Sequence, residues 1–394
     1  MECRALYYEN CHLSRFTARV TACEKTEKGW EVQLDATAFY PEGGGQAADT
    51  GTLEGVPVTH VREKDGKIYH LCAAPLEVGA EVEGILDYAG RFDRMQQHSG
   101  EHIVSGLIHS RWGWHNTGFH MGSDVVTIDF DGVIPPQELP ALEAAANEAV
   151  WRNIPLKIWT PSEQELLNVR YRTKRALPWP VRIVEVPGFD TCACCGVHVA
   201  STGEIGLIKL FSAIPFRGGT RMEMACGRRA LEILNQAYDQ NRQVSQAFSA
   251  KLSETGEAAR KMNDQLSALK YRITGLERKI FASIARGYAG AGNVLHFQEG
   301  LDNTALRELA DAIAESCGGA AAVLTGEDGA YGFCLVTRQG DLRDFTKDMT
   351  AALGGRGGGK PNYQQGRLTA SRQQIEEFFR TPGGTSWTGI LRKP

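Results

Sequence analysis

The chain has 394 residues, of which 42% are hydrophobic and 23% charged, a composition typical of a globular protein of two to four domains. No apolar run approaches the roughly 20 residues that span a bilayer, and the first residues lack the basic and apolar segments of a secretion signal, so we expect a cytoplasmic protein without membrane contact. The net charge of −4 excludes a general attraction to nucleic acid, so an RNA partner would need a local basic patch.

The first 88 residues alternate short hydrophobic and polar stretches, separated by Gly, Pro and Asp turns. This pattern predicts a small β-barrel or sandwich. The segment TAFYPEGGGQAADTGTL interrupts it, and Gly43, Gly44 and Gly45 would let its backbone turn tightly or approach another group closely. From the glycines alone it is a loop between strands.

Residues 89–228 alternate between helical and extended patterns and predict an α+β domain. Helices are expected over residues 90–112 and 135–153. Strands are expected over residues 125–130, 181–186, 205–213 and 221–227.

Residues 229–286 show a long, uninterrupted helical pattern, with apolar residues at spacings of three and four from Leu231 to Ile280. More than four heptads of this kind predict a coiled coil that links the flanking domains, either as an antiparallel hairpin or between two chains. The weak points of the pattern are Asn241, Ser245, Gly256 and Gly275.

Residues 287–394 return to a compact α/β pattern: a strand over 293–297, a helix over 303–317, two strands up to residue 337, and a helix over 342–353. The glycine-rich segment GGRGGGKPNYQQG follows. It contains the G-x-x-x-x-G-K spacing of a phosphate-binding loop, but Pro361 stands where Ser or Thr is required, which disfavours nucleotide hydrolysis. The whole chain is therefore expected to be an α+β multidomain protein.

Two histidines in the first predicted helix are candidates for metal ligands. His98 and His102 are four residues apart, so both imidazoles project from one face of the helix and can converge on one ion. The same stretch, HSGEH, also fits the H-x-x-E-H pattern of inverted zincins, in which Glu101 would be the general base for peptide hydrolysis.

A second group of candidate ligands lies in DTCACCGVH, which holds Cys192, Cys194, Cys195 and His198. Zinc prefers four nitrogen or sulfur ligands in a tetrahedron. Cys194 with His198, Cys195 with His198, or Cys192 with Cys195 would each complete the histidine pair, and the spacing alone does not choose among them.

Three motifs in register carry a resemblance to a known family. FYPEGGGQAADTG, then HSGEH, then CCGVHVASTGEIG about ninety residues later is similar to the editing module of alanyl-tRNA synthetases and of the freestanding AlaX proteins. The family pattern assigns Zn²⁺ to His98, His102, Cys194 and His198. It leaves Cys192 and Cys195 outside the ligand set, and an extra thiol at Cys195, where the family often has Gly, keeps that position as an alternative ligand.

The C-terminal glycine-rich segment resembles the DHH-associated domain of alanyl-tRNA synthetases. Together with the editing module and the coiled coil, it resembles the long form of AlaX over nearly the whole chain. The Asp-His-His motif of phosphoesterases does not occur in the sequence. The resemblance therefore implies a C-terminal domain that binds RNA or dimerises, and it allows a homodimer through this domain and the coiled coil.

The activity implied by the resemblance is deacylation of alanine tRNA that carries serine or glycine by mistake. Zinc would activate a water molecule or position the substrate, and we favour positioning, with Glu101 as the base that orients the attacking water. Thr117 is the first candidate to bind the serine hydroxyl, and Thr37 is the second.

The predicted substrate and tRNA contacts form three groups. The glycine-rich turn offers Gly43, Gly44, Gly45 and Gln46. The stretch RYRTKRALPWPVR offers Arg170, Arg172 and Arg175, interleaved with aromatic residues on which an unpaired base could stack. The C-terminal domain offers Arg356 and Lys360 to phosphate oxygens.

Two other classes of protein fit parts of the same pattern. An inverted-zincin metalloprotease would cleave peptides and depend on Glu101 but not on Cys194. A non-catalytic zinc-containing RNA-binding protein would keep the metal without turning over any ester.

Overall fold

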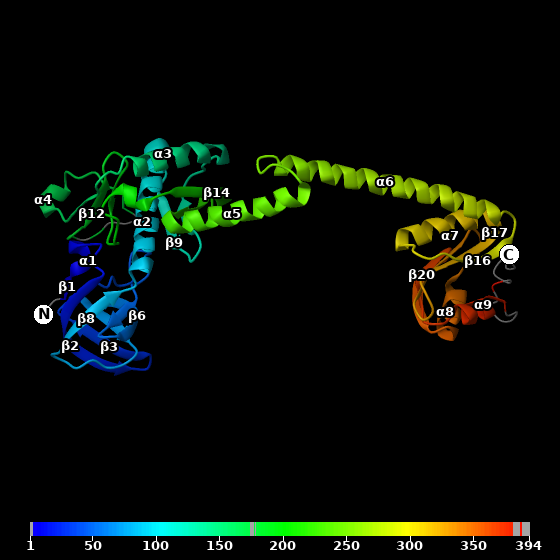
Figure 1. Cartoon of the computed structure of the whole chain (residues 1–394), viewed down its shortest axis with the longest axis horizontal. Helices are drawn as coiled ribbons and strands as arrows, with labels where there is room; N and C mark the ends of the chain where they lie inside the picture. The colour runs from blue at the N-terminus through cyan, green and yellow to red at the C-terminus, as the bar shows by residue number, and fades with distance from the viewer. Residues whose placement is uncertain (1–2, 174–176, 178, 381–386, 388–394) are drawn as a thin grey trace. The chain divides into compact units, whose positions relative to one another are not determined.

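The computed structural model describes residues 3–173, 177, 179–380 and 387, so the predicted tRNA contact Arg175 lies outside the described residues. The chain forms two compact units, Met1–Gln243 and Val244–Pro394 (Figure 1). Within the described parts of the chain, no helix combines the length and the apolar character needed to cross a membrane.

The first unit begins with six antiparallel strands whose hydrogen-bonding order is β2-β3-β7-β6-β5-β8, and β8 pairs back onto β2. Each strand is thus paired on both sides, as a barrel requires. The strands are β2 (Arg15–Thr26), β3 (Gly29–Leu34), β5 (Gly51–Leu53), β6 (Val56–Lys64), β7 (Lys67–Cys72) and β8 (Glu81–Leu86). Outside these six strands, β1 (Arg4–Ala5) pairs in parallel with β4 (Ala36–Thr37). The short helix α1 (Leu6–Glu9) directly follows β1.

Helix α2 (Tyr88–Trp112) leads from these strands into the rest of the unit (Figure 1). It begins where the Asp87 side chain accepts a hydrogen bond from the Gly90 amide at 3.2 Å, and it ends at Gly113, whose φ of 77° is left-handed. The helix predicted over residues 90–112 is confirmed. Fourteen of its 25 residues are buried, so it is a core helix rather than a surface helix.

Two further sheets complete the first unit. The four-stranded sheet has the order β14-β15-β10-β9, and the three-stranded sheet has the order β11-β12-β13. Their strands are β9 (Asn116–Met121), β10 (Val126–Phe130), β11 (Lys157–Trp159), β12 (Ile183–Val186), β13 (Asp190–Ala193), β14 (Ile208–Phe216) and β15 (Gly219–Cys226). The helices are α3 (Leu139–Trp151) and α4 (Glu163–Leu166), with short 3₁₀ turns at Pro136–Glu138 and Thr202–Ile205.

A buried ion pair joins the glycine-rich segment to α2. Arg91 is completely buried, and its Nε lies 2.9 Å from Oδ2 of Asp49. Asp49 also accepts the Tyr40 amide at 2.6 Å, while Arg91 donates to the Ala38 carbonyl at 2.6 Å. Because breaking a buried pair leaves an uncompensated charge, this network holds residues 38–49 firmly against the helix.

The helical pattern predicted over residues 229–286 forms two helices, α5 (Gly227–Phe248) and α6 (Thr255–Gly287), so its helical character is confirmed and it contains a break. Ser249 adopts a left-handed φ of 52°, which a continuing helix does not allow, and the Ser245 hydroxyl donates to the Ala250 carbonyl at 2.6 Å. None of the predicted weak points is the place where the helix stops. Pairing of these helices as a coiled coil stays a prediction.

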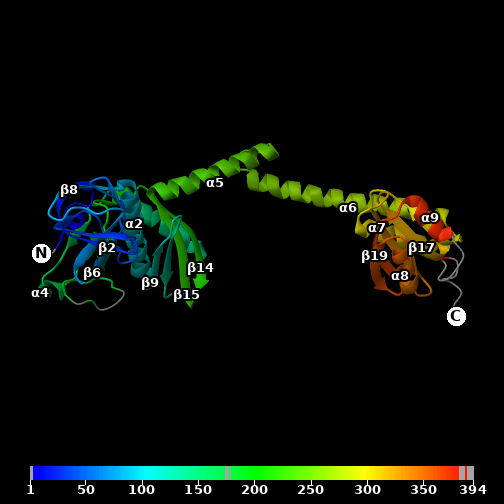
Figure 2. The same ribbon diagram turned by 90° about the horizontal axis from the view of Figure 1, so that it is seen from below.

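The second unit contains a five-stranded sheet of order β16-β17-β18-β20-β19. Its strands are β16 (Gly292–Phe297), β17 (Gly318–Thr325), β18 (Tyr331–Thr337), β19 (Gly355–Lys360) and β20 (Tyr363–Leu368). Its helices are α7 (Asn303–Cys317), which packs on β17 (Figure 2), α8 (Arg343–Ala352) and α9 (Arg372–Arg380). The glycine-rich segment GGRGGGKPNYQQG forms a hairpin. In it β19 pairs with β20, from Gly355 opposite Leu368 to Lys360 opposite Tyr363.

The buried His70 of β7 makes the stability of the fold depend on pH. Burial lowers the pKa of His70 from 6.5 to about 4. As the pH drops, His70 therefore takes up a proton near pH 6.5 in the unfolded chain but only near pH 4 in the folded chain. Because the proton binds the unfolded chain first, the free energy of unfolding falls as the pH drops from about 6.5 to about 4. In chemical denaturation at pH 7 and pH 4.5, His70→Gln should lose about 2 kcal/mol less than the wild type between the two values. Equal losses would contradict this.

Candidate metal centre

Two segments far apart in the sequence bring four donor atoms to one point. His98 and His102 lie one turn apart on α2, and Cys194 and His198 lie on the loop that follows β13. The four ligand atoms all lie within 4.8 Å of one another. Nε2 of His98 and Nε2 of His198 are each 3.4 Å from Sγ of Cys194.

These separations fit zinc. A sulfur at about 2.3 Å and a nitrogen at about 2.0 to 2.1 Å on one tetrahedral ion lie about 3.5 Å from each other. The observed 3.4 Å between Cys194 Sγ and two imidazole nitrogens is close to this value. The donor set of three imidazoles and one thiol is also one that zinc prefers.

Each imidazole holds its other nitrogen, Nδ1, against a polar side chain. The pairs are His98 with Gln46 Oε1 at 2.9 Å, His198 with Ser99 Oγ at 3.1 Å, and His102 with Asp190 Oδ2 at 3.1 Å. Such partners fix the tautomer and the orientation of a metal-binding histidine. Because these partners occupy Nδ1, the Nε2 atom of each of the three rings stays available to bind a metal ion together with Cys194.

The electrostatics single out Cys194 among the three clustered cysteines. Burial by itself would raise the pKa of the Cys194 thiol, but His98, His102 and His198 hold it well below its usual range through their charge and their hydrogen bonds. Burial lowers the pKa of His198 to about 3, and the charge of His98 adds to this effect. A thiolate at Cys194 beside a neutral His198 is the protonation state that a metal requires. For His102 burial lowers the pKa, but hydrogen bonds to Asp190 and Cys194 outweigh it and raise the pKa, so a bound cation would have to displace that proton.

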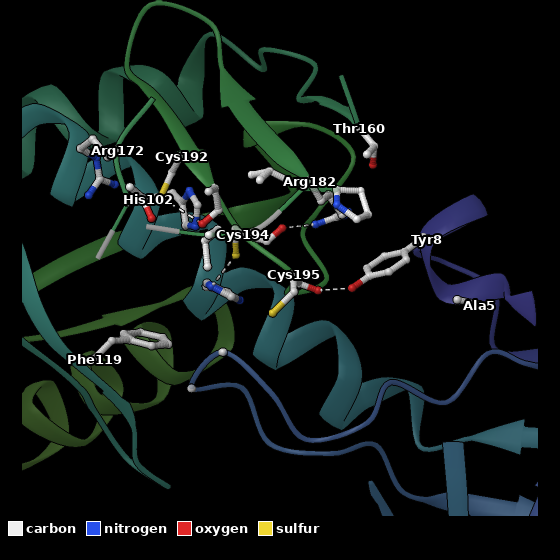
Figure 3. Close-up of a pocket in the computed structure, with 18 of the residues that line it drawn as sticks. Ala5, Tyr8, His102, Phe119, Thr160, Arg172, Arg182, Cys192, Cys194 and Cys195 are labelled. Carbon is white, nitrogen blue, oxygen red and sulfur yellow. Dashed lines mark hydrogen bonds between the residues drawn. The ribbon is translucent and has the colours of Figure 1, made fainter. Parts of the chain in front are cut away.

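The other two thiols differ in their surroundings. Burial raises the pKa of Cys192 to about 11, and Cys192 belongs to a separate group with His102 and Asp190. Cys195 is exposed and belongs to neither metal-capable group found among the described residues. Its Sγ lies 3.8 Å from the Tyr40 hydroxyl. In Figure 3, Cys195 lies between Cys194 and the Tyr8 ring.

Hydrogen bonds to three successive carbonyl groups hold the loop that carries Cys194. Arg182 donates to the carbonyls of Cys194 and Gly196 at 2.8 and 2.9 Å, and the Tyr8 hydroxyl donates to the carbonyl of Cys195 at 2.6 Å. The Arg182 guanidinium also lies 4.3 Å from the centre of the Tyr8 ring. Gly196 passes so close to the imidazole of His98 that a Cβ would come within 2.2 Å of Cε1, so only glycine fits there.

The glycine-rich segment makes a tight turn against the same site. The amide and carbonyl of Gly43 bond to those of Gln46 at 3.1 and 2.9 Å, and Gly44 and Gly45 have φ of 61° and 86°, as a type I′ turn requires. A Cβ on Gly44 would lie 3.0 Å from Cys195 Sγ. Gln46, predicted to bind substrate, instead accepts the Val197 amide at 3.2 Å and contacts His98.

A cavity of about 1030 Å³ opens beside the donor atoms and is lined by His98, His102, Cys194 and Glu101, among others. Glu101 is buried, and its Oε1 accepts hydrogen bonds from Ser105 Oγ and Asn116 Nδ2, both at 2.5 Å. Figure 3 shows the rings of Phe119 and Tyr8 on opposite sides of the cysteine sulfur atoms. The cavity therefore combines aromatic walls, a metal-capable group and a buried carboxylate.

Several predicted contacts lie elsewhere. The Thr117 hydroxyl donates to the Asp129 carbonyl at 3.2 Å, and Thr37 is buried with its hydroxyl 2.8 Å from Nε2 of His70, so neither lines the cavity. The Arg172 guanidinium, expected to meet phosphate, binds Asp190 at 2.6 and 2.8 Å. The remaining predicted tRNA contacts are exposed: Arg170 in the first unit, and Arg356 and Lys360 on β19 of the second.

Sequence reasoning missed the residues that support the ligands, which are Tyr8, Ser99, Arg182 and Asp190, and it missed Asn116 in the cavity. Ser99 stands inside HSGEH and Asp190 two positions before Cys192, so proximity to the motifs was the only available signal. Tyr8 lies 187 positions from its partner Cys195, and no sequence pattern links them.

Arg172 should affect metal affinity because it orients Asp190, which in turn contacts His102. Arg172→Ala should weaken zinc binding by about 10- to 100-fold in competition with a chromophoric chelator, the usual effect of losing an outer-shell partner. The exposed Arg170→Ala is the matched control and should bind zinc as the wild type does. Wild-type affinity in Arg172→Ala would show that this chain of contacts is irrelevant to the metal.

Three domain models match the chain in order: tRNA synthetases class II (A) over residues 4–89, the threonyl and alanyl tRNA synthetase second additional domain over residues 181–223, and the DHHA1 domain over residues 289–381. The alanyl-tRNA editing protein Aarsd1 of Danio rerio is 26% identical over 94% of this chain and 96% of its own length. The alanyl-tRNA editing protein AlaX-L of Pyrococcus horikoshii gives the same values. An alanine–tRNA ligase of Thermofilum pendens is 31% identical over 94% of this chain but only 42% of the ligase.

Both editing proteins match nearly end to end, and the synthetase matches over less than half of its length. Over nearly its whole length the chain is therefore similar to alanyl-tRNA editing proteins, and it matches two synthetase domain models and the DHHA1 domain.

Proposed function

We propose that this chain is an aminoacyl-tRNA deacylase, a carboxylic ester hydrolase that removes serine or glycine from mischarged alanine tRNA with the help of Zn²⁺. The observation that carries the proposal is the convergence of three buried histidines and the half-buried Cys194 on one side of a substrate-sized cavity. The relatives named alanyl-tRNA editing proteins supply the substrate class.

Such an activity has a clear physical purpose. A synthetase pocket shaped for alanine discriminates by only about 1 to 3 kcal/mol against a residue that is smaller by one methyl group or larger by one hydroxyl. A second site that hydrolyses the wrong ester makes up the difference. We place this activity in the cytoplasm, where we expect the protein to meet charged tRNA.

We assign the metal to His98, His102, Cys194 and His198. Bound zinc would supply a Lewis acid that holds and polarises the ester. Glu101 would orient the attacking water and accept its proton. Both hydrogen bonds described for Glu101 go to Oε1, which favours Oε2 for this task.

The tRNA contacts of the proposal lie in both units. Arg170 and the backbone of the turn Gly43–Gln46 would approach the acceptor end near the cavity. Arg356 and Lys360, exposed on β19, would meet phosphate oxygens elsewhere on the tRNA. We propose that residues 1–88, 89–228, 229–286 and 287–394 are the functional domains of the chain. We also propose that two chains form a homodimer through residues 229–286 and 287–394.

Two cysteine variants test the metal assignment and the activity together. Cys194→Ala should lose bound zinc and slow hydrolysis of Ser-tRNA of the alanine isoacceptor by at least about 100-fold, because the donor set is broken. Cys195→Ala is the matched control at the neighbouring position and should retain both the bound zinc and the hydrolysis of Ser-tRNA. Wild-type protein that hydrolyses the serine ester no faster than the alanine ester would refute editing, and zinc lost from Cys195→Ala but kept in Cys194→Ala would reverse the ligand assignment.

Glu101→Gln tests the base. It should retain zinc and slow Ser-tRNA hydrolysis by about 10²- to 10⁴-fold, the usual effect of losing a general base. The exposed Glu148→Gln is the control and should be fully active. Full activity in Glu101→Gln would remove Glu101 from the mechanism. Cleavage of peptides by the wild type would instead favour a metalloprotease, and zinc binding without any turnover would favour a non-catalytic RNA-binding protein.

A further inference from the structure

Asn116, the first residue of β9, is a buried polar side chain that lines the cavity beside the metal-capable group. Only 6% of its surface is exposed. Its Nδ2 donates to Oε1 of Glu101 at 2.5 Å and lies 3.5 Å from Oγ of Ser105. An ionised carboxylate only accepts hydrogen bonds, so the nitrogen of the amide must face Glu101 and the orientation of Asn116 is settled.

The other atom of this amide, Oδ1, is buried and has no hydrogen-bond partner among the described residues. A buried, unpaired acceptor destabilises the folded protein, because it has lost its water without gaining a donor. Asn116 lines the cavity, so a ligand in the cavity can supply the missing donor.

The proposed substrate carries two kinds of donor. Its α-ammonium group is charged and binds best to an ionised carboxylate, through a charge-assisted hydrogen bond, rather than to a neutral amide. The side-chain hydroxyl of serine is neutral and is matched by a neutral amide oxygen. The ammonium group is common to serine, glycine and alanine, so a contact with it would not distinguish the three esters.

We propose that Oδ1 of Asn116 accepts a hydrogen bond from the serine hydroxyl. Through this contact Asn116 would make the site prefer the serine ester to the alanine ester. The inference rests on the proposed editing function and extends it to specificity. Alanine would leave Oδ1 buried and unpaired, which sites built to bind a hydroxyl penalise strongly. Glycine leaves space in which a water molecule can reach Oδ1. The neighbouring Thr117, whose hydroxyl already donates to Asp129, is not required.

The test compares hydrolysis of the serine and glycine esters. In Asn116→Ala, kcat/KM for Ser-tRNA should fall by about 10- to 100-fold more than kcat/KM for Gly-tRNA, because loss of the donor to Glu101 affects both esters alike whereas loss of Oδ1 affects only the serine ester. Asn116→Leu, close in volume but without an acceptor, should behave in the same way, and zinc content confirms that each variant is folded.

Ser105→Ala is the matched control, because it removes the other donor to Glu101 and leaves Oδ1 of Asn116 in place. It should change both esters by the same factor. If the Asn116 variants also slow both esters equally, or slow neither, the inference is wrong, because Asn116 would then act only through Glu101 or not at all.

Binding of stable 3′-amide analogues of seryl- and alanyl-adenosine separates this inference from the proposed function. The wild type should bind the seryl analogue more tightly by about tenfold or more, and Asn116→Ala should bind both alike. A wild type that hydrolyses no ester but shows this preference would refute the editing activity and keep the hydroxyl site. Equal binding of both analogues by the wild type would overturn the hydroxyl site.

Discussion

Three imidazoles and one thiol share a single point in the interior of the first unit, and the arrangement of the surrounding chain depends on this contact. Side chains of this kind do not gather in a core for hydrophobic reasons: burial lowers the pKa of His198, and the neighbouring histidines lower the pKa of Cys194 although burial opposes this. A cation at their centre would turn repulsion between neighbours into attraction to one charge. The site is thus built for a ligand with the properties of zinc.

The supporting groups explain why such a site can persist at one geometry. The carbonyl groups of Cys194, Cys195 and Gly196 are bound by Arg182 and Tyr8, and Nδ1 of His102 lies 3.1 Å from Asp190. The ion pair between Asp49 and Arg91 holds the glycine-rich turn against α2. Each of these contacts joins segments that are distant in the sequence, so the metal-capable group, the turn and the cavity form one rigid arrangement. This is what positioning an ester demands.

The outer residues of the site also correct the roles expected from charge alone. Arg172 lies in a basic stretch that suggests phosphate binding, yet its guanidinium is used to hold Asp190. Gln46 lies in a glycine-rich motif that suggests substrate binding, yet its amide oxygen contacts His98. Both are polar side chains with strong local patterns, and in both cases the partner is contributed by a distant segment. A local pattern identifies what a residue can do, whereas its neighbours determine what it does.

The sequence alone was sufficient for features that depend on local periodicity. These include α2 with its two histidines one turn apart, α7, and the first three strands of the second unit. It was insufficient wherever several local solutions are close in energy. The helical pattern of residues 229–286 did not reveal the left-handed Ser249, and the glycine-rich segment before Lys360 forms a strand because β20 pairs with it. The choice among three clustered cysteines likewise depends on direction: the loop held by Arg182 and Tyr8 turns the Cys194 sulfur toward the histidines, and spacing carries no information about direction.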